Sequence, residues 1–171
     1  MDALFQIAVY IPLLPALLAA VVWRSLRGAS RWFAICLWAV ALFSTTGDVW
    51  TLLGYENNLP FFHGYILVEF VLLLPVYRQL LTPSSQSSTW LIIGSGFTLL
   101  WLLNVFFGDG LWGYPSYIHA VEALLLCQFA VRWFFKILRE KVEQKPTRTF
   151  GFWLSTGILM YFTCNLLLFA F

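Results

Sequence analysis

Four ionisable side chains lie inside long apolar stretches of the chain: Asp48, Glu69, His119 and Glu122. They are the residues of this sequence that are best suited to binding or catalysis. Ionisable residues within a membrane-spanning segment are rare and are functional candidates by default. Carboxyl groups beside an imidazole can bind a ligand, carry protons, or serve as an acid and base set. We assign no catalytic residue among them.

His119 and Glu122 are three positions apart, so on a helix both project from the same face. This spacing suits a hydrogen bond that fixes the imidazole tautomer, or two ligands of one metal ion. Two ligands do not complete a transition-metal site, although Asp48 and Glu69 could add oxygen donors. Three interpretations stay open: a structural hydrogen-bonded network, a ligand or proton site, and a metal site formed by all four residues.

Six apolar stretches must position these residues, and a helix needs about 20 apolar residues to cross the hydrocarbon core. They cover residues 4–23, 32–53, 61–81, 89–107, 114–138 and 150–171. Their continuous apolar character favours helices over the alternating strands of a membrane barrel. We predict an all-α fold, a polytopic transmembrane helix bundle of six helices, with residues 1–171 forming a single integral membrane domain.

The composition supports this class. The chain is 61% hydrophobic and 11% charged, whereas a soluble domain of this size is nearer half apolar and a quarter charged. The composition excludes a nucleic-acid-binding module, a secreted disulfide scaffold and a disordered tail. The expected partner is therefore the lipid bilayer and not nucleic acid. No oligomeric state is predicted.

The basic residues indicate the orientation. All ten Lys and Arg flank or fill loops on one side of the predicted bundle, and the opposite side carries Asp2, Glu56 and Asp109. Cytoplasmic loops of membrane proteins carry an excess of Lys and Arg. We therefore expect a multi-pass protein of the cell (inner) membrane with cytoplasmic basic loops and both termini outside. Pro12 and Pro15 are expected to kink or open the first span.

The depths of the polar residues predict one cavity that opens outward. At about 1.5 Å per residue, Glu69 and Glu122 lie roughly 12 Å from the outer ends of their helices, and Asp48 and His119 lie roughly 7–8 Å from theirs. Two amides fall in the outer part of their spans as well: Asn104 and Asn165.

No fixed cation accompanies the two deeper carboxyl groups, Glu69 and Glu122, because every Lys and Arg is on the other side. Three alternatives stay open for these carboxyl groups. They would be protonated, since burial disfavours the charged form, or they would bind an imported cation. The third alternative is pairing with His119, or with His63 from the rim.

Two segments carry a resemblance: ENNLPFFHGYILVEFVLLL at residues 56–74 and FWLSTGILMYFTCNLLLF at residues 152–169. They resemble a group of small uncharacterised bacterial multi-span membrane proteins, which are similar to membrane regions that precede signalling kinases. The resemblance implies a sensory role through a separate signalling partner at the cytoplasmic loops. It also marks Glu69 and Asn165 as site candidates.

The favoured function is small-ligand binding, or sensing through a partner, in the outward-facing polar cavity. The alternatives are a proton-coupled transporter that uses Glu69 and Glu122, and an intramembrane enzyme that acts on lipid or depends on a metal. The inner half shows no polar path for transport, and no G-x-S-x-G or H-E-x-x-H motif supports an enzyme. Retinal is excluded because no Lys occupies an outer or central helix position, and haem is disfavoured because His63 and His119 both lie near the rim. No other cofactor is implied.

Overall fold

The computed structural model describes residues 11–55, 57–81, 87–139 and 145–170, and every regular element in this part of the chain is helical. The prediction of an all-α fold with six helices is confirmed for these residues. The α-helices are α2 (Leu13–Val22), α3 (Ala29–Leu52), α4 (Leu59–Leu81), α5 (Ser87–Phe107), α6 (Ser116–Arg139) and α7 (Phe150–Ala170). Two short 3-10 helices, Trp23–Ser25 and Pro146–Arg148, precede α3 and α7.

Helix α2 differs from the predicted first span. It begins at Leu13, directly after Pro12, and Pro15 lies in its first turn. The N–H groups of a first turn have no partner within the helix, so proline is tolerated there without a kink. Pro15 is therefore accommodated in the first turn of α2, and residues 4–10 of the predicted span lie outside the described residues.

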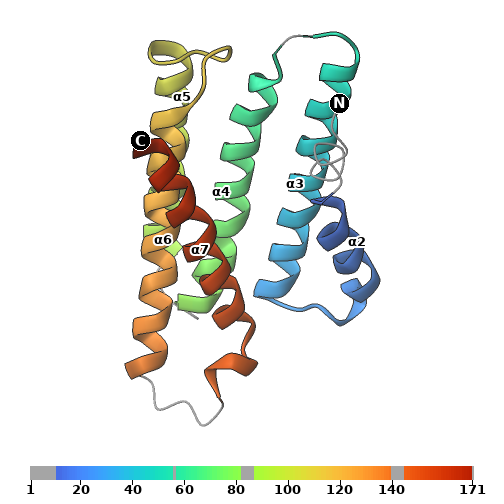
Figure 1. Ribbon diagram of the computed structural model, residues 1–171. Coiled ribbons are helices and arrows are strands. Elements are labelled where there is room, and N and C mark those ends of the chain that lie inside the picture. The colour runs from blue at the N-terminus through green and yellow to red at the C-terminus, as the bar shows by residue number, and fades with distance from the viewer. Residues whose placement is uncertain (1–10, 56, 82–86, 140–144, 171) are drawn as a thin grey trace.

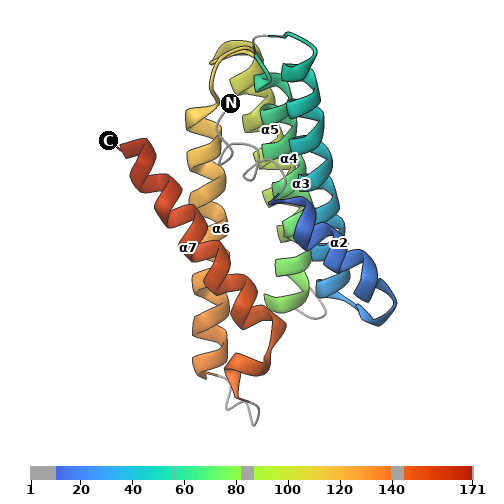
Figure 2. The ribbon, with the colours of Figure 1, turned by 45° about the vertical axis from the view of Figure 1, so that its right-hand side comes forward.

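The helices pack mainly as pairs, α3 against α4 and α6 against α7, and α2 lies beside α3 (Figure 1). The core contains buried side chains from α4, α5, α6 and α7, and side chains three or four positions apart form the buried face of each helix. Phe70 of α4 stacks on Phe97 of α5 with ring centroids 3.9 Å apart, and Tyr77 packs against Phe129 of α6. Helix α7 crosses α6 obliquely, and its C-terminal end diverges from the bundle (Figure 2).

Three helices, α3, α4 and α5, are long and apolar enough to cross a membrane, and α2 belongs to a shorter apolar segment. Among the described residues α6 and α7 do not meet the same criterion. Helix α6 is less apolar because it contains His119, Glu122 and the basic residues of its last turns. Among the described residues, the structure thus supports the predicted membrane class through these three helices.

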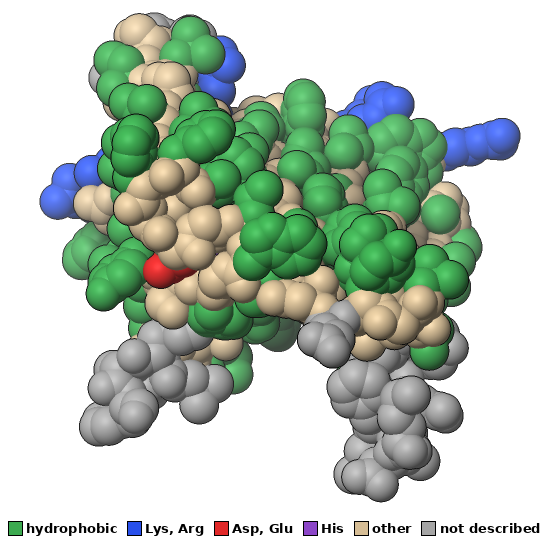
Figure 3. Space-filling view, turned by 90° about the horizontal axis from the view of Figure 1, so that it is seen from above, with side chains coloured by type: hydrophobic (Ala, Val, Ile, Leu, Met, Phe, Trp, Pro, Cys, Tyr) green, Lys and Arg blue, Asp and Glu red, His purple; other side chains and the backbone are tan. Residues whose placement is uncertain are grey.

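Basic side chains gather at one end of the bundle, where α2 leads into α3, α4 ends, and α6 leads into α7 (Figure 1). At this end Lys136 Nζ donates a hydrogen bond to the carbonyl oxygen of Leu80, 2.8 Å away. A cation beside the last carbonyls of a helix interacts favourably with the helix dipole. The opposite end, seen from above in Figure 3, presents mainly green hydrophobic side chains together with tan atoms, and an acidic side chain is visible in red.

Candidate functional site

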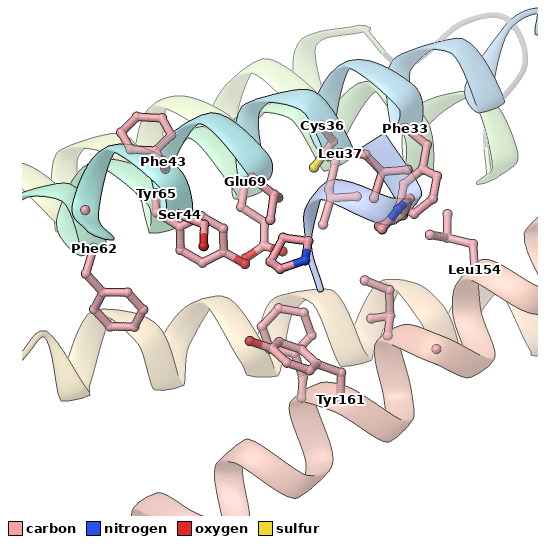
Figure 4. A pocket seen from close by; sticks show the side chains of 18 of the residues that line it. Phe33, Cys36, Leu37, Phe43, Ser44, Phe62, Tyr65, Glu69, Leu154 and Tyr161 are labelled. Carbon is pink, nitrogen blue, oxygen red and sulfur yellow. The ribbon is translucent and has the colours of Figure 1, made fainter. Parts of the chain in front are cut away.

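A cavity of about 850 Å³ lies between α7 on one side and α2, α3 and α4 on the other (Figure 4). Its volume is within the range of small-molecule pockets, about 300–1,000 Å³. Its walls are mainly apolar and rich in aromatic rings. The aromatic residues are Phe33, Phe43, Phe61, Phe62, Tyr65, Phe150, Trp153, Tyr161 and Phe162.

Small residues and the course of α7 leave this space open. Cys36, Ser44 and Gly47 line it from α3, and Gly157 lines it from α7. A Cβ atom at Gly157 would meet no heavy atom within 4 Å. Figure 2 shows that α7 diverges from the bundle toward its C-terminal end, and residues of α3, α4 and α7 line the cavity between these helices.

Glu69 provides a carboxyl group midway along the cavity. It lies ten residues after the start of α4, near the middle of that helix and deeper than the sequence predicts. Tyr65, one turn earlier on the same helix, lies close enough to the Glu69 carboxyl group for its hydroxyl to interact with it. The Glu69 Oε2 atom is buried and has no hydrogen-bond partner among the described residues. Glu69 therefore retains an acceptor for a ligand.

Tyr161 extends from α7 toward Glu69 and Tyr65 across the cavity (Figure 4). Its hydroxyl group lies within interaction range of the Tyr65 hydroxyl and of the predicted site residue Asn165. The cluster of Tyr65, Glu69, Tyr161 and Asn165 therefore joins α4 to α7. We call it the Glu69 cluster below.

Asp48 also lines the cavity, but at another level. Its neighbour Gly47 lies beside Asn58, since a Cβ at Gly47 would be 3.5 Å from Asn58 Nδ2. Asp48 is thus level with the start of α4, whereas Glu69 is near its middle. No Lys or Arg is found among the described residues that line the cavity.

His119 and Glu122 form the hydrogen bond that their spacing predicts, with His119 Nδ1 and Glu122 Oε2 3.1 Å apart. Both side chains are buried, and neither lines the cavity. The rings of Phe62 and Phe162 pack against His119 with centroids 5.6 and 6.2 Å away, and both rings belong to the cavity wall. Glu122 is still close enough to Glu69 for electrostatic interaction between the two carboxyl groups.

The remaining candidates lie elsewhere. Asn104 is near the end of α5 beside Gly108 and does not line the cavity. His63 is fully buried, with Nε2 3.0 Å from the carbonyl oxygen of Gly113, so it connects α4 to the loop before α6. His63 thus lies near one end of α4, as predicted, but it is buried and does not line the cavity. Pairing of His63 with Glu69 or Glu122 is not observed.

No group of three or more His, Cys, Asp or Glu side chains among the described residues could hold a metal ion. The predicted set of Asp48, Glu69, His119 and Glu122 does not come together, because Asp48 lies at another level and two aromatic rings separate His119 from the cavity.

Tyr65 and Tyr161 were not among the predicted site residues. Each precedes a predicted one by a single helical turn, Glu69 and Asn165 respectively, so the spacing could have indicated both tyrosines.

Comparisons of the chain with protein-family models, with curated proteins and with solved structures found no match.

Proposed function

We propose that this protein is an integral membrane protein that binds a small amphipathic molecule in the cavity between α7 and the α3–α4 pair. The observation that carries the proposal is the cavity itself, about 850 Å³ with aromatic and apolar walls and the Glu69 cluster midway. Apolar pockets with a few converging polar groups are typical of small-molecule sites. The walls suit the ligand's apolar body, and Glu69 suits its polar group.

The orientation follows from the charge distribution. We place the basic end of the bundle in the cytoplasm, in agreement with the excess of Lys and Arg in cytoplasmic loops. In this orientation Asp48 and Asn58 lie toward the outer end of the cavity, and Phe150 and Trp153 lie toward the cytoplasmic end.

Helix α7 is the element through which binding would be sensed. It forms one wall of the cavity and follows the 3-10 helix Pro146–Arg148 at the basic end. A ligand that changes the angle between α7 and α4 would move this basic segment. A separate signalling partner bound to the segment would respond to that movement. A ligand shifts such an equilibrium only by its difference in affinity for the two states.

Transport is the second candidate, because residues near both ends of the bundle, from Asn58 to Phe150, line the cavity. A carrier would move a labelled ligand into sealed vesicles, whereas a sensor would bind it without net uptake.

Photolabelling tests the binding proposal. The protein in lipid nanodiscs would be irradiated with a decanol that carries a diazirine group, with and without an excess of unlabelled decanol. We expect saturable labelling of α3, α4 and α7 residues that line the cavity. Gly157→Trp should lower the saturable part severalfold, since its side chain would enter the cavity.

Gly96→Trp is the matched control. Gly96 is an exposed glycine of α5 with no heavy atom within 4 Å of a Cβ, and it does not line the cavity. The control should label like the wild type. Labelling that does not saturate, or that is equal in all three proteins, would contradict the proposed function.

A further inference from the structure

We propose that the polar group of the ligand is an ammonium ion, which binds the Glu69 carboxylate between the rings of Tyr65 and Tyr161. This inference rests on the proposed function and deepens it, because it names the chemical class that the same cavity takes. The ligand would be an amine with an apolar body.

The first argument is the charge of the cavity. Two acidic side chains, Asp48 and Glu69, line it, and no Lys or Arg is among its described lining residues. Glu122 behind the wall adds a third carboxyl group within electrostatic range of Glu69. A buried carboxylate is costly unless it is paired and hydrogen-bonded. A cationic ligand would supply that pairing, whereas an anionic ligand would meet repulsion.

The second argument is the unused hydrogen-bond acceptor. The Tyr65 hydroxyl is close to the Glu69 carboxyl group, but the Glu69 Oε2 atom is buried and has no hydrogen-bond partner among the described residues. The imidazole of His119 is within electrostatic range of Glu69, but its Nδ1 is hydrogen-bonded to Glu122. An ammonium N–H would therefore find in Oε2 an acceptor that the protein leaves open.

The third argument is the aromatic surroundings. Figure 4 shows the Tyr65 and Tyr161 rings beside Glu69, from α4 and α7 respectively. Aromatic faces attract ammonium groups through their quadrupole, and aromatic cages recognise alkylated ammonium ligands in this way. An alcohol would use the carboxyl group but would gain little from the rings. The remaining walls, such as Phe33 and Leu154, would accommodate the alkyl part.

The competition form of the photolabelling experiment tests this inference. Decylamine, decanol and decanoate would compete with the diazirine decanol for the wild-type protein near neutral pH, where an alkylamine is protonated. We expect decylamine to compete about tenfold better than decanol, which is the gain expected for a hydrogen bond to a charged group. Decanoate should compete least.

Two variants identify which carboxyl group causes the preference for decylamine. Glu69→Gln should abolish the preference for decylamine while the saturable labelling by decanol persists. Asp48→Asn, which removes the other carboxylate of the cavity, should retain most of the preference. The comparison of competitors in the wild-type protein tests the inference even where E69Q lowers the yield of folded protein.

An ammonium group could come from a free hydrophobic amine or from the head group of phosphatidylethanolamine. Nanodiscs of phosphatidylglycerol, with and without phosphatidylethanolamine, distinguish these sources. Labelling that falls with phosphatidylethanolamine in the wild type but not in E69Q identifies the lipid, and unchanged labelling identifies a free amine.

Equal competition by the three compounds, or a preference for decylamine that survives in E69Q, would overturn the inference. The proposed function would still stand in that case, provided that the labelling is saturable and is lost in Gly157→Trp. Labelling of the wild type that does not saturate would instead overturn the proposed function itself.

Discussion

At the scale of single residues, two neighbouring carboxyl groups have different surroundings. Glu122 is fully buried in the core and is hydrogen-bonded to His119. Glu69 instead lines the cavity, which Glu122 does not, although each carboxyl group leaves one oxygen without a partner among the described residues. We infer that the His119–Glu122 pair stabilises α6, whereas Glu69 serves a ligand.

His119→Ala should lower the free energy of unfolding by about 3 kcal/mol, because it leaves the Glu122 carboxyl group buried without its partner. Glu69→Gln is the matched control and should change the free energy of unfolding by less than about 1 kcal/mol, since the amide keeps the shape and Tyr65 can still donate to it. Denaturant titration of the detergent-solubilised protein, followed by circular dichroism, measures both. Equal losses would contradict the different roles assigned to the two carboxyl groups.

Residue spacing predicted part of the site. The hydrogen bond between His119 and Glu122 follows from the helix period alone. Tyr161 lies beside Tyr65 and Glu69 because of the way α7 crosses the bundle. The spacing of residues along one helix does not specify that crossing. For the same reason the sequence alone could not show that Asn104 does not line the cavity.

At the scale of the helices, small residues determine where α7 approaches its neighbours. A Cβ at Gly151, at the start of α7, would lie 2.6 Å from the Trp133 ring of α6. At Gly157, six residues later, the same atom would meet open space. The glycines of α7 thus have opposite roles, one in close packing and one in the cavity wall.

Gly151→Ala should lower the free energy of unfolding by about 1–3 kcal/mol through overpacking against Trp133. Gly157→Ala should be neutral or stabilise the protein by up to about 1 kcal/mol, because alanine has the higher helix propensity. The same denaturant titration compares the two variants. If Gly157→Ala lowered the free energy of unfolding more than Gly151→Ala, the result would show that α7 does not follow the observed course.

Helix α2 is connected to α3 through Trp38, whose Nε1 donates a hydrogen bond to the carbonyl oxygen of Ala16, 2.9 Å away. Trp38→Phe removes this bond and keeps an aromatic ring beside Trp23. Amide hydrogen exchange within α2 should become about fivefold faster, as expected for the loss of about 1 kcal/mol. Trp32→Phe, at an exposed position of α3, should leave α2 unchanged. Unchanged exchange in the Trp38 variant would show that this bond does not hold α2.

Apolar run length predicted five of the helices to within about three residues of their observed ends, because a continuous apolar stretch bounded by polar residues sets both ends. The oblique course of α7 depends instead on packing at Gly151 and on the open space at Gly157, which the pattern of α7 alone does not reveal.

At the scale of the whole molecule, the basic residues lie away from the polar centre of the cavity. The basic residues lie at one end of the bundle, and the Glu69 cluster lies near its middle. This arrangement underlies our proposals that a cationic ligand pairs with Glu69 and that the basic end of the bundle lies in the cytoplasm.

Cysteine labelling tests that orientation. In a protein whose Cys36, Cys127 and Cys164 are replaced by alanine, Trp112→Cys and Thr147→Cys place single thiols at exposed positions near opposite ends. A membrane-impermeant maleimide added to intact cells should modify the thiol at position 112. The thiol at position 147 should react only after the membrane is permeabilised. The reverse pattern would invert the proposed topology.

Native mass spectrometry with decylamine tests the central claim, a single binding site in the cavity, most directly. We predict one saturable adduct on the wild-type protein and on Gly96→Trp, and loss of that adduct in Gly157→Trp, where the indole fills the cavity. Adducts that increase in number with concentration and are equal in all three proteins would contradict the claim, since they would report only nonspecific partitioning onto apolar surface.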